Sequence, residues 1–373
     1  MSAAESATEP GLLKGPLHDL HARLGARFVG FGGFEMPVQY SSIKEEHEAV
    51  RTHVGLFDVS HMSNLRIEGP GAEALLSRTT VSDAAKLKVG RGVYTAVLRD
   101  DGTILDDTIF YRMADDSFYL VPNAGLNEAV RAALEAHADD VEGDVTVTDV
   151  SRATCIFALQ GPDAPAVLKA AGADVPDTPP FRIHEAQVDG AVCQVATTGY
   201  TGETGYELFV SEERGPEVFE ALLDAGKVHG IEPVGLGARD TLRLEMGFAL
   251  AGNEFEGGRT PLEAGLGWAV KWDHDFVGKE ALVRQKETDD HDRLVGLELS
   301  GRGIARHGYA VLDGSGQQVG IVTSGTLSPS LDTAIALAYV RPGQAAPGTE
   351  VAVDVRGRPV AATVAKTPFL KRS

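Results

Sequence analysis

One aspartate, Asp107, stands in the middle of a stretch that is typical of a β-strand. The stretch VYTAVLRDDGTILDDTIFY, residues 93–111, predicts a β-hairpin, because Asp-Gly between two β-rich runs is a strong turn signal. Alternation along the strand places Asp107 on the same side as Leu105 and Ile109. A carboxylate on a packed face is unfavourable unless something binds it. Taken alone, the stretch also fits a solvated or salt-bridged aspartate.

A second carboxylate, Glu207, takes a similar place further along the chain. A strand, a Gly-Pro turn and a helix are predicted twice, at 65–76 and at 157–171, and each copy is followed by a hairpin and another helix. Copies roughly 100 residues apart indicate an internal duplication rather than a short-repeat solenoid. Aligning the hairpin of residues 192–210 with the first one puts Glu207 where Asp107 stands. We therefore expect both acids to face one shared cleft.

An arginine next to a predicted helix start completes the set of candidate site residues. The segment PVGLGARD leads into a helix from Thr241, with Asp240 as the expected cap and Arg239 just before it. A cation at the positive end of a helix dipole is electrostatically unfavourable. Arg239 therefore indicates an acceptor-rich partner nearby.

The first Gly-Pro turn also fits a dinucleotide-binding pattern. Gly69, Gly71 and Ala74 match G-x-G-x-x-A after a predicted strand. Against this interpretation, Pro70 removes a backbone N–H where a pyrophosphate would need a donor. No long series of βαβ units follows either. We expect no dinucleotide site here.

Composition excludes several classes of function. The 373 residues are 43% hydrophobic and 24% charged, which is ordinary for a globular protein. A formal charge of -20 disfavours nucleic acid as a partner, because phosphate binding needs a basic surface. No apolar run approaches the roughly 20 residues that span a bilayer, so no membrane association is predicted. The N-terminal MSAAESATEPGLL has no basic or apolar signal region and no Arg, which predicts a cytoplasmic enzyme.

Cysteine and histidine patterns give no metal or redox site. Cys155 and Cys193 stand in apolar runs without C-x-x-C spacing and are predicted to be buried core residues. The 11 histidines form no H-E-x-x-H or other paired ligand spacing, and Asp273-His274-Asp275 is predicted to be a polar turn. We expect no metal.

The remaining chain divides into two regions. Helices are expected at 17–24, at 43–53 after a Ser41-Ser42 cap, and from Asp275 to Gln285; residues 265–271 are predicted to form a strand. The polar stretch ETDDHD at 287–292 is the best linker. Short alternating strands separated by Gly and Pro turns follow, which is typical of a β-barrel or sandwich. The predicted regions are therefore 1–286 and 287–373.

Together these motifs resemble the aminomethyltransferase family, the T proteins of the glycine cleavage system. The resemblance runs from about Pro16 to Phe369 in the family's order. The combination of GLFDVSHM, TGYTGETGYELF and GLGARD is highly specific, whereas each motif alone is only suggestive. The other matching strings are EMPVQYSSIKEEHEAVR, GTILDD, VPN, FALQGP, DFVGKEAL and VTSG.

The resemblance implies an α+β fold in which two intertwined, duplicated α+β folate-binding subdomains are followed by a C-terminal β-barrel. It also implies a reaction in which an aminomethyl group leaves the lipoyl arm of a partner H protein. Ammonia is released, and the methylene carbon passes to tetrahydrofolate, giving 5,10-methylenetetrahydrofolate.

The resemblance assigns roles to single residues by their position in the matching motifs. Asp107 is similar to the family's catalytic aspartate. Glu207 and Arg239 are similar to residues that hold the pterin ring, and four further folate-lining positions are matched by Tyr94, Tyr200, Asn123 and Met62. A carboxylate can accept from the N3–H and the 2-amino group of a pterin, and a guanidinium can donate to its carbonyl.

The chemistry of C–S cleavage suits an ionised Asp107. Cleavage makes an iminium-like carbon, which a preorganised carboxylate stabilises. We expect this electrostatic role and substrate orientation to outweigh general base catalysis, because an aspartate of ordinary pKa is a weak base.

Three other functions share this fold and stay open as alternatives. One is a folate-dependent demethylase of small thio or amino compounds, which lacks the paired acids of Asp106-Asp107. Another is a non-enzymatic folate-binding factor in iron–sulfur assembly, which centres on a cysteine that Thr198-Gly199-Tyr200 does not provide. The third is the folate domain of amine dehydrogenases, which needs an additional flavin domain.

Overall fold

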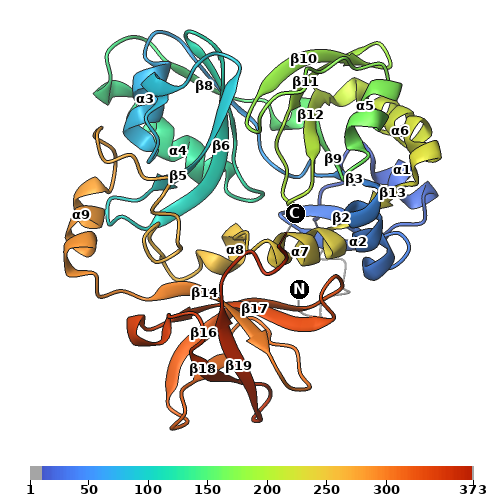
Figure 1. Ribbon diagram of the computed structural model, residues 1–373. Helices are drawn as coiled ribbons and strands as arrows, with labels where there is room; N and C mark the ends of the chain where they lie inside the picture. The colour runs from blue at the N-terminus through green and yellow to red at the C-terminus, as the bar shows by residue number, and fades with distance from the viewer. Residues whose placement is uncertain (1–10, 372–373) are drawn as a thin grey trace.

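A computed structural model describes residues 11–371, so most of the N-terminal stretch examined for targeting signals lies outside the described residues. The described chain forms three lobes (Figure 1). The first lobe, drawn blue to cyan, and the second, green to yellow, stand side by side above an orange-to-red barrel. No helix of the described residues combines the length and the apolar character needed to cross a membrane.

The first lobe is a five-stranded sheet with two helices, which we call the first half. Its strand order is β5-β6-β7-β4-β8. The strands are β4 (Leu65–Glu68), β5 (Arg91–Leu98), β6 (Ile104–Ala114), β7 (Ser117–Val121) and β8 (Thr146–Asp149), and the helices are α3 (Ala72–Thr79) and α4 (Asn127–Glu135). The predicted hairpin is confirmed, because β5 and β6 pair antiparallel around a turn in which Gly102 N–H donates to Arg99 O at 2.9 Å.

The second lobe, the second half, repeats this arrangement with one strand added. Its order is β10-β11-β12-β9-β3-β13. The strands are β3 (Val54–Asp58), β9 (Thr154–Gln160), β10 (Ile183–Val188), β11 (Ala191–Ala196), β12 (Gly205–Ser211) and β13 (Ile231–Val234), and the helices are α5 (Ala164–Ala170) and α6 (Gly215–Gly226). Strand β3 comes from the N-terminal part of the chain and inserts between β9 and β13. The two halves are therefore duplicated and intertwined.

The strand orders correct one expectation about the two acids. Each half contains a three-strand meander, β5-β6-β7 or β10-β11-β12. The last strand of each meander pairs with the strand that leads into the Gly-Pro turn of that half, β4 or β9. Strand β6 therefore corresponds to β11, and β7 to β12. Asp107 on β6 and Glu207 on β12 do not occupy equivalent positions, so the predicted alignment was wrong. A meander contains two consecutive hairpins. The predicted alignment matched the first hairpin of one meander, β5-β6, with the second hairpin of the other, β11-β12, because a two-strand pattern does not distinguish them.

The two Gly-Pro turns do correspond, and they have the same backbone requirement. Gly69 and Gly161 adopt φ of +119° and +136°, which only glycine reaches readily. A Cβ at either would come within 2.4 Å of a carbonyl oxygen. A Cβ at Gly71 would lie 2.5 Å from Gly143 O. The loop before β8 thus packs onto the glycines of the dinucleotide-like motif, which agrees with the expectation that no dinucleotide binds there.

The N-terminal segment packs on the second half. It contains α1 (His18–Arg23), the hairpin of β1 (Arg27–Phe31) and β2 (Phe34–Gln39), and α2 (Ile43–Thr52). The predicted cap of α2 is confirmed, because the Ser42 side chain accepts from Glu45 N–H at 3.2 Å. Helix α2 then leads directly into β3, so this cap helps to fix the strand that intertwines the halves.

The chain leaves the second half through the centre of the molecule and ends in a barrel. Helices α7 (Leu236–Glu245) and α8 (Ala251–Glu254) lie between the lobes, and α9 (Lys279–Thr288) lies beside the first half (Figure 1). The predicted strand at residues 265–271 was wrong: this stretch forms consecutive turns, with Gly265 at φ +71° and Ala269 N–H donating to Leu266 O. Helix α9 also takes up the first two residues of the predicted linker.

The barrel is closed. Its order is β14-β17-β16-β15-β18-β19, and β14 pairs with β19 to complete it. The strands are β14 (Arg293–Leu299), β15 (Ala310–Leu312), β16 (Gln318–Ser328), β17 (Thr333–Val340), β18 (Glu350–Asp354) and β19 (Pro359–Ala365). The choice that the sequence left open between barrel and sandwich is thus decided for the barrel.

The two halves are joined to the rest of the molecule by different forces. Near the second half, Arg51 forms ion pairs of 2.7 Å with both Glu203 and Glu245, and Glu245 also accepts from Ser328 of the barrel. The first half instead packs through an apolar cluster that joins its β5-β6 hairpin to the chain from the end of α8 into α9. This cluster includes Val81, Leu98, Ile104, Phe255, Phe276 and Leu282.

Candidate functional site

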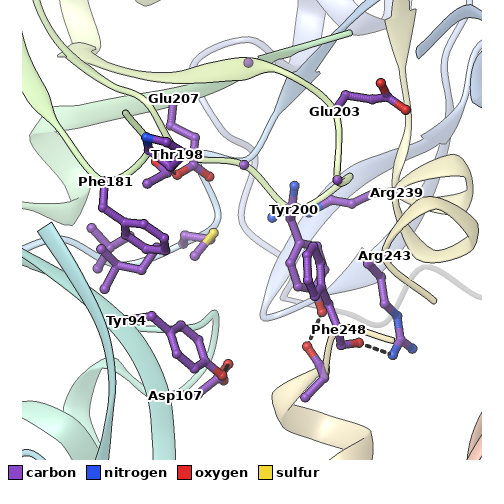
Figure 2. Close-up of a pocket in the computed structure, with 18 of the residues that line it drawn as sticks. Tyr94, Asp107, Phe181, Thr198, Tyr200, Glu203, Glu207, Arg239, Arg243 and Phe248 are labelled. Atoms are coloured by element: carbon purple, nitrogen blue, oxygen red, sulfur yellow. Dashed lines mark hydrogen bonds between the residues drawn. The ribbon is translucent and has the colours of Figure 1, made fainter. Parts of the chain in front are cut away.

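One large cavity, of about 1470 Å³, lies between the two halves and the top of the barrel. Its wall is formed by residues of both sheets, by α7 and the following loop, and by several barrel residues. All seven site residues predicted from the sequence line it: Met62, Tyr94, Asp107, Asn123, Tyr200, Glu207 and Arg239. Figure 2 shows the acids and the arginine approaching this space from different elements.

Asp107 is fixed in the cavity wall by two hydrogen bonds. Tyr94 OH donates to its Oδ2 at 2.7 Å, and Asn123 Nδ2 donates to its Oδ1 at 2.8 Å. Its side chain points into the cavity, although the residue is only 9% exposed. Neutral donors hold this carboxylate, and no salt bridge to it is found among residues 11–371.

The preceding residue, Asp106, is completely buried and holds Asn123 in place. It accepts from Asn123 N–H at 2.9 Å and from Asn123 Nδ2 at 2.8 Å. The same Nδ2 also lies 2.6 Å from Asp107 O. A single asparagine therefore ties both carboxyl groups and the strand between them into one rigid unit.

Burial sets the protonation of the two acids. It raises the pKa of Asp107 to about 6, although the hydrogen bonds from Tyr94 and Asn123 act in the opposite direction. Burial and the neighbouring Asp107 charge raise the pKa of Asp106 well above its usual range. The expectation of an ordinary pKa for Asp107 was wrong, because the strand buries it, and Asp107 is a competent proton acceptor near pH 7.

Glu207 lies across the cavity in a less enclosed setting. It is half-buried, and Thr198 Oγ1 donates to its Oε2 at 2.5 Å. Tyr111, on β6 of the first half, forms a hydrogen bond of 2.9 Å with the same threonine hydroxyl. The chain Tyr111–Thr198–Glu207 therefore connects the two halves and holds the carboxylate at the cavity wall.

Arg239 presents an unsatisfied donor. Its Nη1 is buried and has no hydrogen-bond partner among the described residues, and its Cζ lies 4.6 Å from the centre of the Tyr200 ring. Burial lowers the pKa of Arg239, and the charge of Glu207 partly offsets this effect. A buried guanidinium with an unpaired N–H is costly unless a ligand supplies an acceptor.

The structure corrects the expected helix cap beside Arg239. Helix α7 begins at Leu236, with Gly235 at the cap position, so Asp240 lies inside the helix. A Cβ at Gly235 would lie 2.3 Å from the Val38 carbonyl carbon, which explains why a glycine precedes the helix. Asp240 instead pairs with Arg243 at 2.8 Å.

Arg243 fixes the floor of the cavity. This 1% exposed guanidinium also donates to Phe248 O, to Glu254 Oε2 at 3.1 Å and to Ser324 Oγ at 2.8 Å. The contacts attach α7 to α8, to the loop between them and to the barrel, so the helix that carries Arg239 is held on several sides.

Aromatic residues form much of the wall, and the sequence indicated only some of them. Tyr94 stacks on Trp268 with ring centres 5.7 Å apart, and Tyr200 stacks on Phe248 at 5.8 Å. Tyr200 OH also donates to Ala249 O. Trp268 and Phe248 were missed because their contacts are distant in sequence and depend on loops without a regular pattern.

Met62 and the neighbouring His61 complete the wall near Arg239. His61 is 6% exposed, and its Nδ1 has no partner in the described chain. Burial and the charge of Arg239 lower the pKa of His61 to about 4, so the ring is neutral at pH 7. The S-H-M motif led to the prediction of Met62 as a site residue, and His61 was missed. Of these two neighbours, His61 is the one with a polar group near Arg239.

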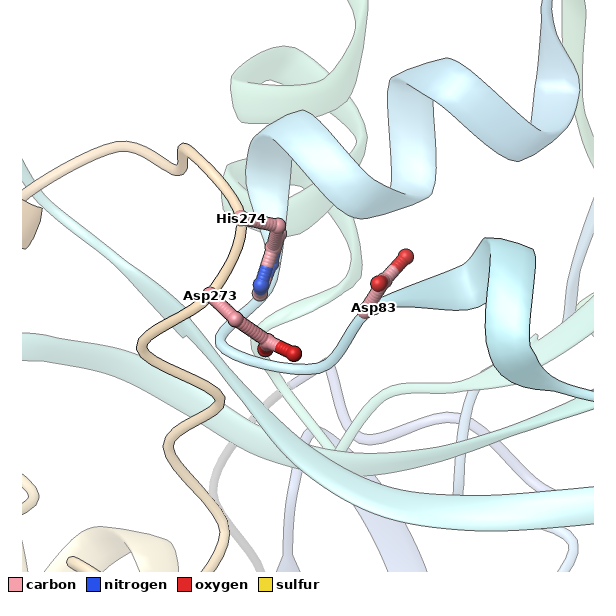
Figure 3. A group of neighbouring side chains, drawn as sticks. All are labelled: Asp83, Asp273 and His274. Atoms are coloured by element: carbon pink, nitrogen blue, oxygen red, sulfur yellow. The ribbon is translucent and has the colours of Figure 1, made fainter.

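One group of side chains outside the cavity has the spacing of a metal site. Figure 3 shows Asp83, Asp273 and His274 close together, and these are the candidate ligands found among residues 11–371. Lys86 Nζ, however, lies 3.3 Å from Asp83 and also contacts Asp273. This ammonium group pairs with both carboxylates and offsets one of their two negative charges, so a lysine already takes the place that a cation would occupy.

Comparisons with known proteins agree with this architecture. Residues 17–274 match the GCVT N-terminal domain family, and residues 293–371 match the glycine cleavage T-protein C-terminal barrel domain. The chain is 46% identical to an aminomethyltransferase of Geobacillus kaustophilus, covering 97% of this chain and 100% of the relative. It is 43% identical to an aminomethyltransferase of Halothermothrix orenii, covering 96% and 99%.

A solved structure shares the whole arrangement. The glycine cleavage system aminomethyltransferase T from Bartonella henselae superimposes with a TM-score of 0.90 at 37% identity, covering 96% of this chain and 98% of the other. Sequence and fold thus agree over nearly the full length. The chain belongs to the aminomethyltransferase family, the T proteins of the glycine cleavage system.

Proposed function

We propose that this enzyme transfers a methylene carbon from the aminomethyl-dihydrolipoyl arm of a lipoylated H protein to tetrahydrofolate. The C–S and C–N bonds of the S–CH2–NH2 group break, and two C–N bonds form in 5,10-methylenetetrahydrofolate. The two protons leaving the folate nitrogens balance the thiol and the ammonia that are released.

The observation that carries this proposal is the contrast between charges in one cavity. Asp107 is an ionised carboxylate held by neutral donors, whereas Glu207 faces the same space as Arg239 and its unpaired N–H. Asp107 can stabilise a developing positive charge. Glu207 can accept hydrogen bonds from a ligand, and Arg239 can donate to an acceptor on the same ligand.

The residues fit tetrahydrofolate. Glu207 can accept from an N–H and an amino group on one edge of a pterin, and Arg239 Nη1 can donate to a carbonyl on that ring. Tyr94 and Tyr200 supply aromatic surface. The volume of about 1470 Å³ exceeds the ~300–1,000 Å³ of usual small-molecule pockets, so it also has room for a lipoyl arm. When bound, tetrahydrofolate supplies the two nitrogen nucleophiles.

The protein's own contribution is orientation and charge. Tyr94 and Asn123 hold the two oxygens of Asp107 in one position, so little reorganisation is needed when positive charge develops at the transferred carbon. The neutral ring of His61 adds no positive charge that would compete for Asp107. The pKa of about 6 also allows Asp107 to accept a proton at neutral pH.

We further propose that residues 1–286 form the folate-binding region and residues 287–373 a separate barrel domain. The barrel closes on itself and has its own apolar core, including Leu297, Val311, Ala336 and Val353. It reaches the cavity with a few residues only, among them Leu337 and Thr367.

Ammonia release from aminomethylated H protein, measured with and without tetrahydrofolate, tests the function. We expect rapid release with tetrahydrofolate, formation of 5,10-methylenetetrahydrofolate in equal amount, and far slower release without it. Asp107→Asn should lose this activity, while Asp100→Asn, an exposed residue in the turn of the same hairpin, should keep it. A wild-type enzyme that releases no ammonia, but demethylates a small thio or amino compound, would contradict the proposal.

A further inference from the structure

Phe181 has an unusual backbone conformation for an aromatic residue. Its φ is +63°, in the left-handed region that side chains with a Cβ rarely adopt. Five non-glycine residues of the described chain have positive φ: Phe181, Asp189, Asp289, Asp332 and Arg356. Three are aspartates, which tolerate this region better than other residues. Of the five, Phe181 is the one that lines the cavity.

Hydrogen bonds from both halves hold the Phe181 backbone in this conformation. Its N–H donates to Thr197 O at 3.0 Å within the second half, and its C=O accepts from Gly92 N–H of β5 at 2.9 Å. The adjacent Arg182 forms an isolated bridge with Arg91. The segment before β10 thus joins the edge of one sheet to the other, and this junction sets the direction of the side chain.

The Phe181 ring projects into the cavity from the side opposite Arg239. Figure 2 shows it below Glu207 and Thr198 and across the open space from Tyr200 and Arg239. Tyr94 and Tyr200 each have one face covered by a stacked aromatic ring. Phe181 has no such ring partner among the described residues, so its face is available to a ligand.

We propose that Phe181 is a specificity-determining residue that contacts the face of the bicyclic ring whose polar edge Glu207 and Arg239 bind. A glycine would fit the backbone better, and the aromatic ring is retained for its contact with the ligand. This inference rests on the proposed function, because it assumes that the cavity binds tetrahydrofolate.

Phe181→Gly separates fold from binding. The glycine relieves the strained φ, so the unfolding temperature should stay within a few degrees of the wild type. Affinity for tetrahydrofolate, measured by calorimetry, should fall about 10- to 100-fold through loss of apolar and aromatic contact. Asp189→Gly relieves positive φ at an exposed turn outside the cavity and should leave affinity unchanged.

Phe181→Leu provides a second variant that keeps both the strained backbone and the apolar bulk. It should weaken tetrahydrofolate about 2- to 10-fold through loss of the flat ring alone. Neither variant should change the affinity for p-aminobenzoylglutamate, which lacks the bicyclic ring. Unchanged tetrahydrofolate affinity in both variants, or equal weakening of both ligands, would overturn the inference. Failure of the wild-type protein to bind tetrahydrofolate would instead contradict the proposed function.

Discussion

The two halves share one strand order but place their acids differently. Asp107 lies on β6, the middle strand of the first meander, whereas Glu207 lies on β12, the last strand of the second. Asp107 is nearly buried beside a second carboxyl group and is held by neutral donors. Glu207 is half-buried and shares the cavity with the Arg239 cation. The duplicated strand order thus forms the walls of the cavity, and the residues that differ between the halves give the two acids different roles.

The halves also differ in how they attach to the rest of the molecule. The second half is joined through the buried ions Arg51, Glu203 and Glu245, and the first through the apolar surface of its hairpin. Removing one member of a buried ion pair leaves an uncompensated charge, whereas trimming an apolar side chain leaves a cavity and no buried charge.

The largest effect is expected at the ionic junction. Arg51→Ala should lower the free energy of unfolding by about 3–5 kcal/mol, because it removes the guanidinium that pairs with the buried carboxylates of both Glu203 and Glu245. Urea unfolding at pH 7 measures this change. The pKa of Glu245 is lowered from 4.5 to about 2 by its histidine, serine and arginine partners, against the effect of burial. Its contribution is therefore complete above pH 4.5 and is lost as the pH falls toward 2. A change of less than about 1 kcal/mol would show that the junction behaves like a surface salt bridge.

Asp107→Asn should have the largest effect on catalysis. Turnover should fall several hundredfold, about the size of one key electrostatic contact, since the amide cannot stabilise positive charge or accept a proton. Asparagine keeps the size of the side chain and an oxygen that can accept from Tyr94. Steady-state ammonia release gives the rate, and normal turnover in this variant would remove Asp107 from its assigned role.

Glu207→Gln tests whether Glu207 binds the ligand. Affinity for tetrahydrofolate should fall about 10- to 100-fold, because a charge-assisted hydrogen bond is replaced by a neutral one. Calorimetric titration of the folded variant measures the loss. Thr198 can still donate to the glutamine oxygen, so the wall should keep its shape. An unchanged dissociation constant would mean that Glu207 does not contact the ligand.

The smallest effect concerns the pH profile. Because Asp107 acts as a carboxylate and its pKa is about 6, kcat/KM should decrease as the pH falls through 6. Tyr94→Phe removes a hydrogen bond that lowers this pKa, so the acid limb should move to higher pH. If the acid limb of the kcat/KM profile stays at the same pH in Tyr94→Phe, or moves to lower pH, a group other than Asp107 controls it.

Local signals in the sequence predicted the frame of this site well. Asp-Gly in the β5-β6 turn, Ser42 at the start of α2 and the two Gly-Pro turns act through neighbouring residues, and all of them are confirmed. The seven cavity residues were also identified, but their roles came from the resemblance of whole motifs to a family.

Features that depend on distant contacts were not predicted. The strained φ of Phe181 is imposed by Gly92 and Thr197, which belong to different halves. The pairing of Trp268 with Tyr94 joins residues far apart in the chain. The match of Asp107 with Glu207 failed because a hairpin pattern does not contain the third strand of a meander. The raised pKa of Asp107 likewise depends on burial that only the assembled sheets create.

Single-turnover ammonia release as a function of tetrahydrofolate concentration compares the two acids most directly. We expect Glu207→Gln to recover to within a few-fold of the wild-type rate at saturating tetrahydrofolate. Asp107→Asn should remain several hundredfold slower at every concentration, with a nearly normal half-saturation point. If Asp107→Asn is rescued by tetrahydrofolate while Glu207→Gln is not, the assignment of chemistry to one half and binding to the other is contradicted.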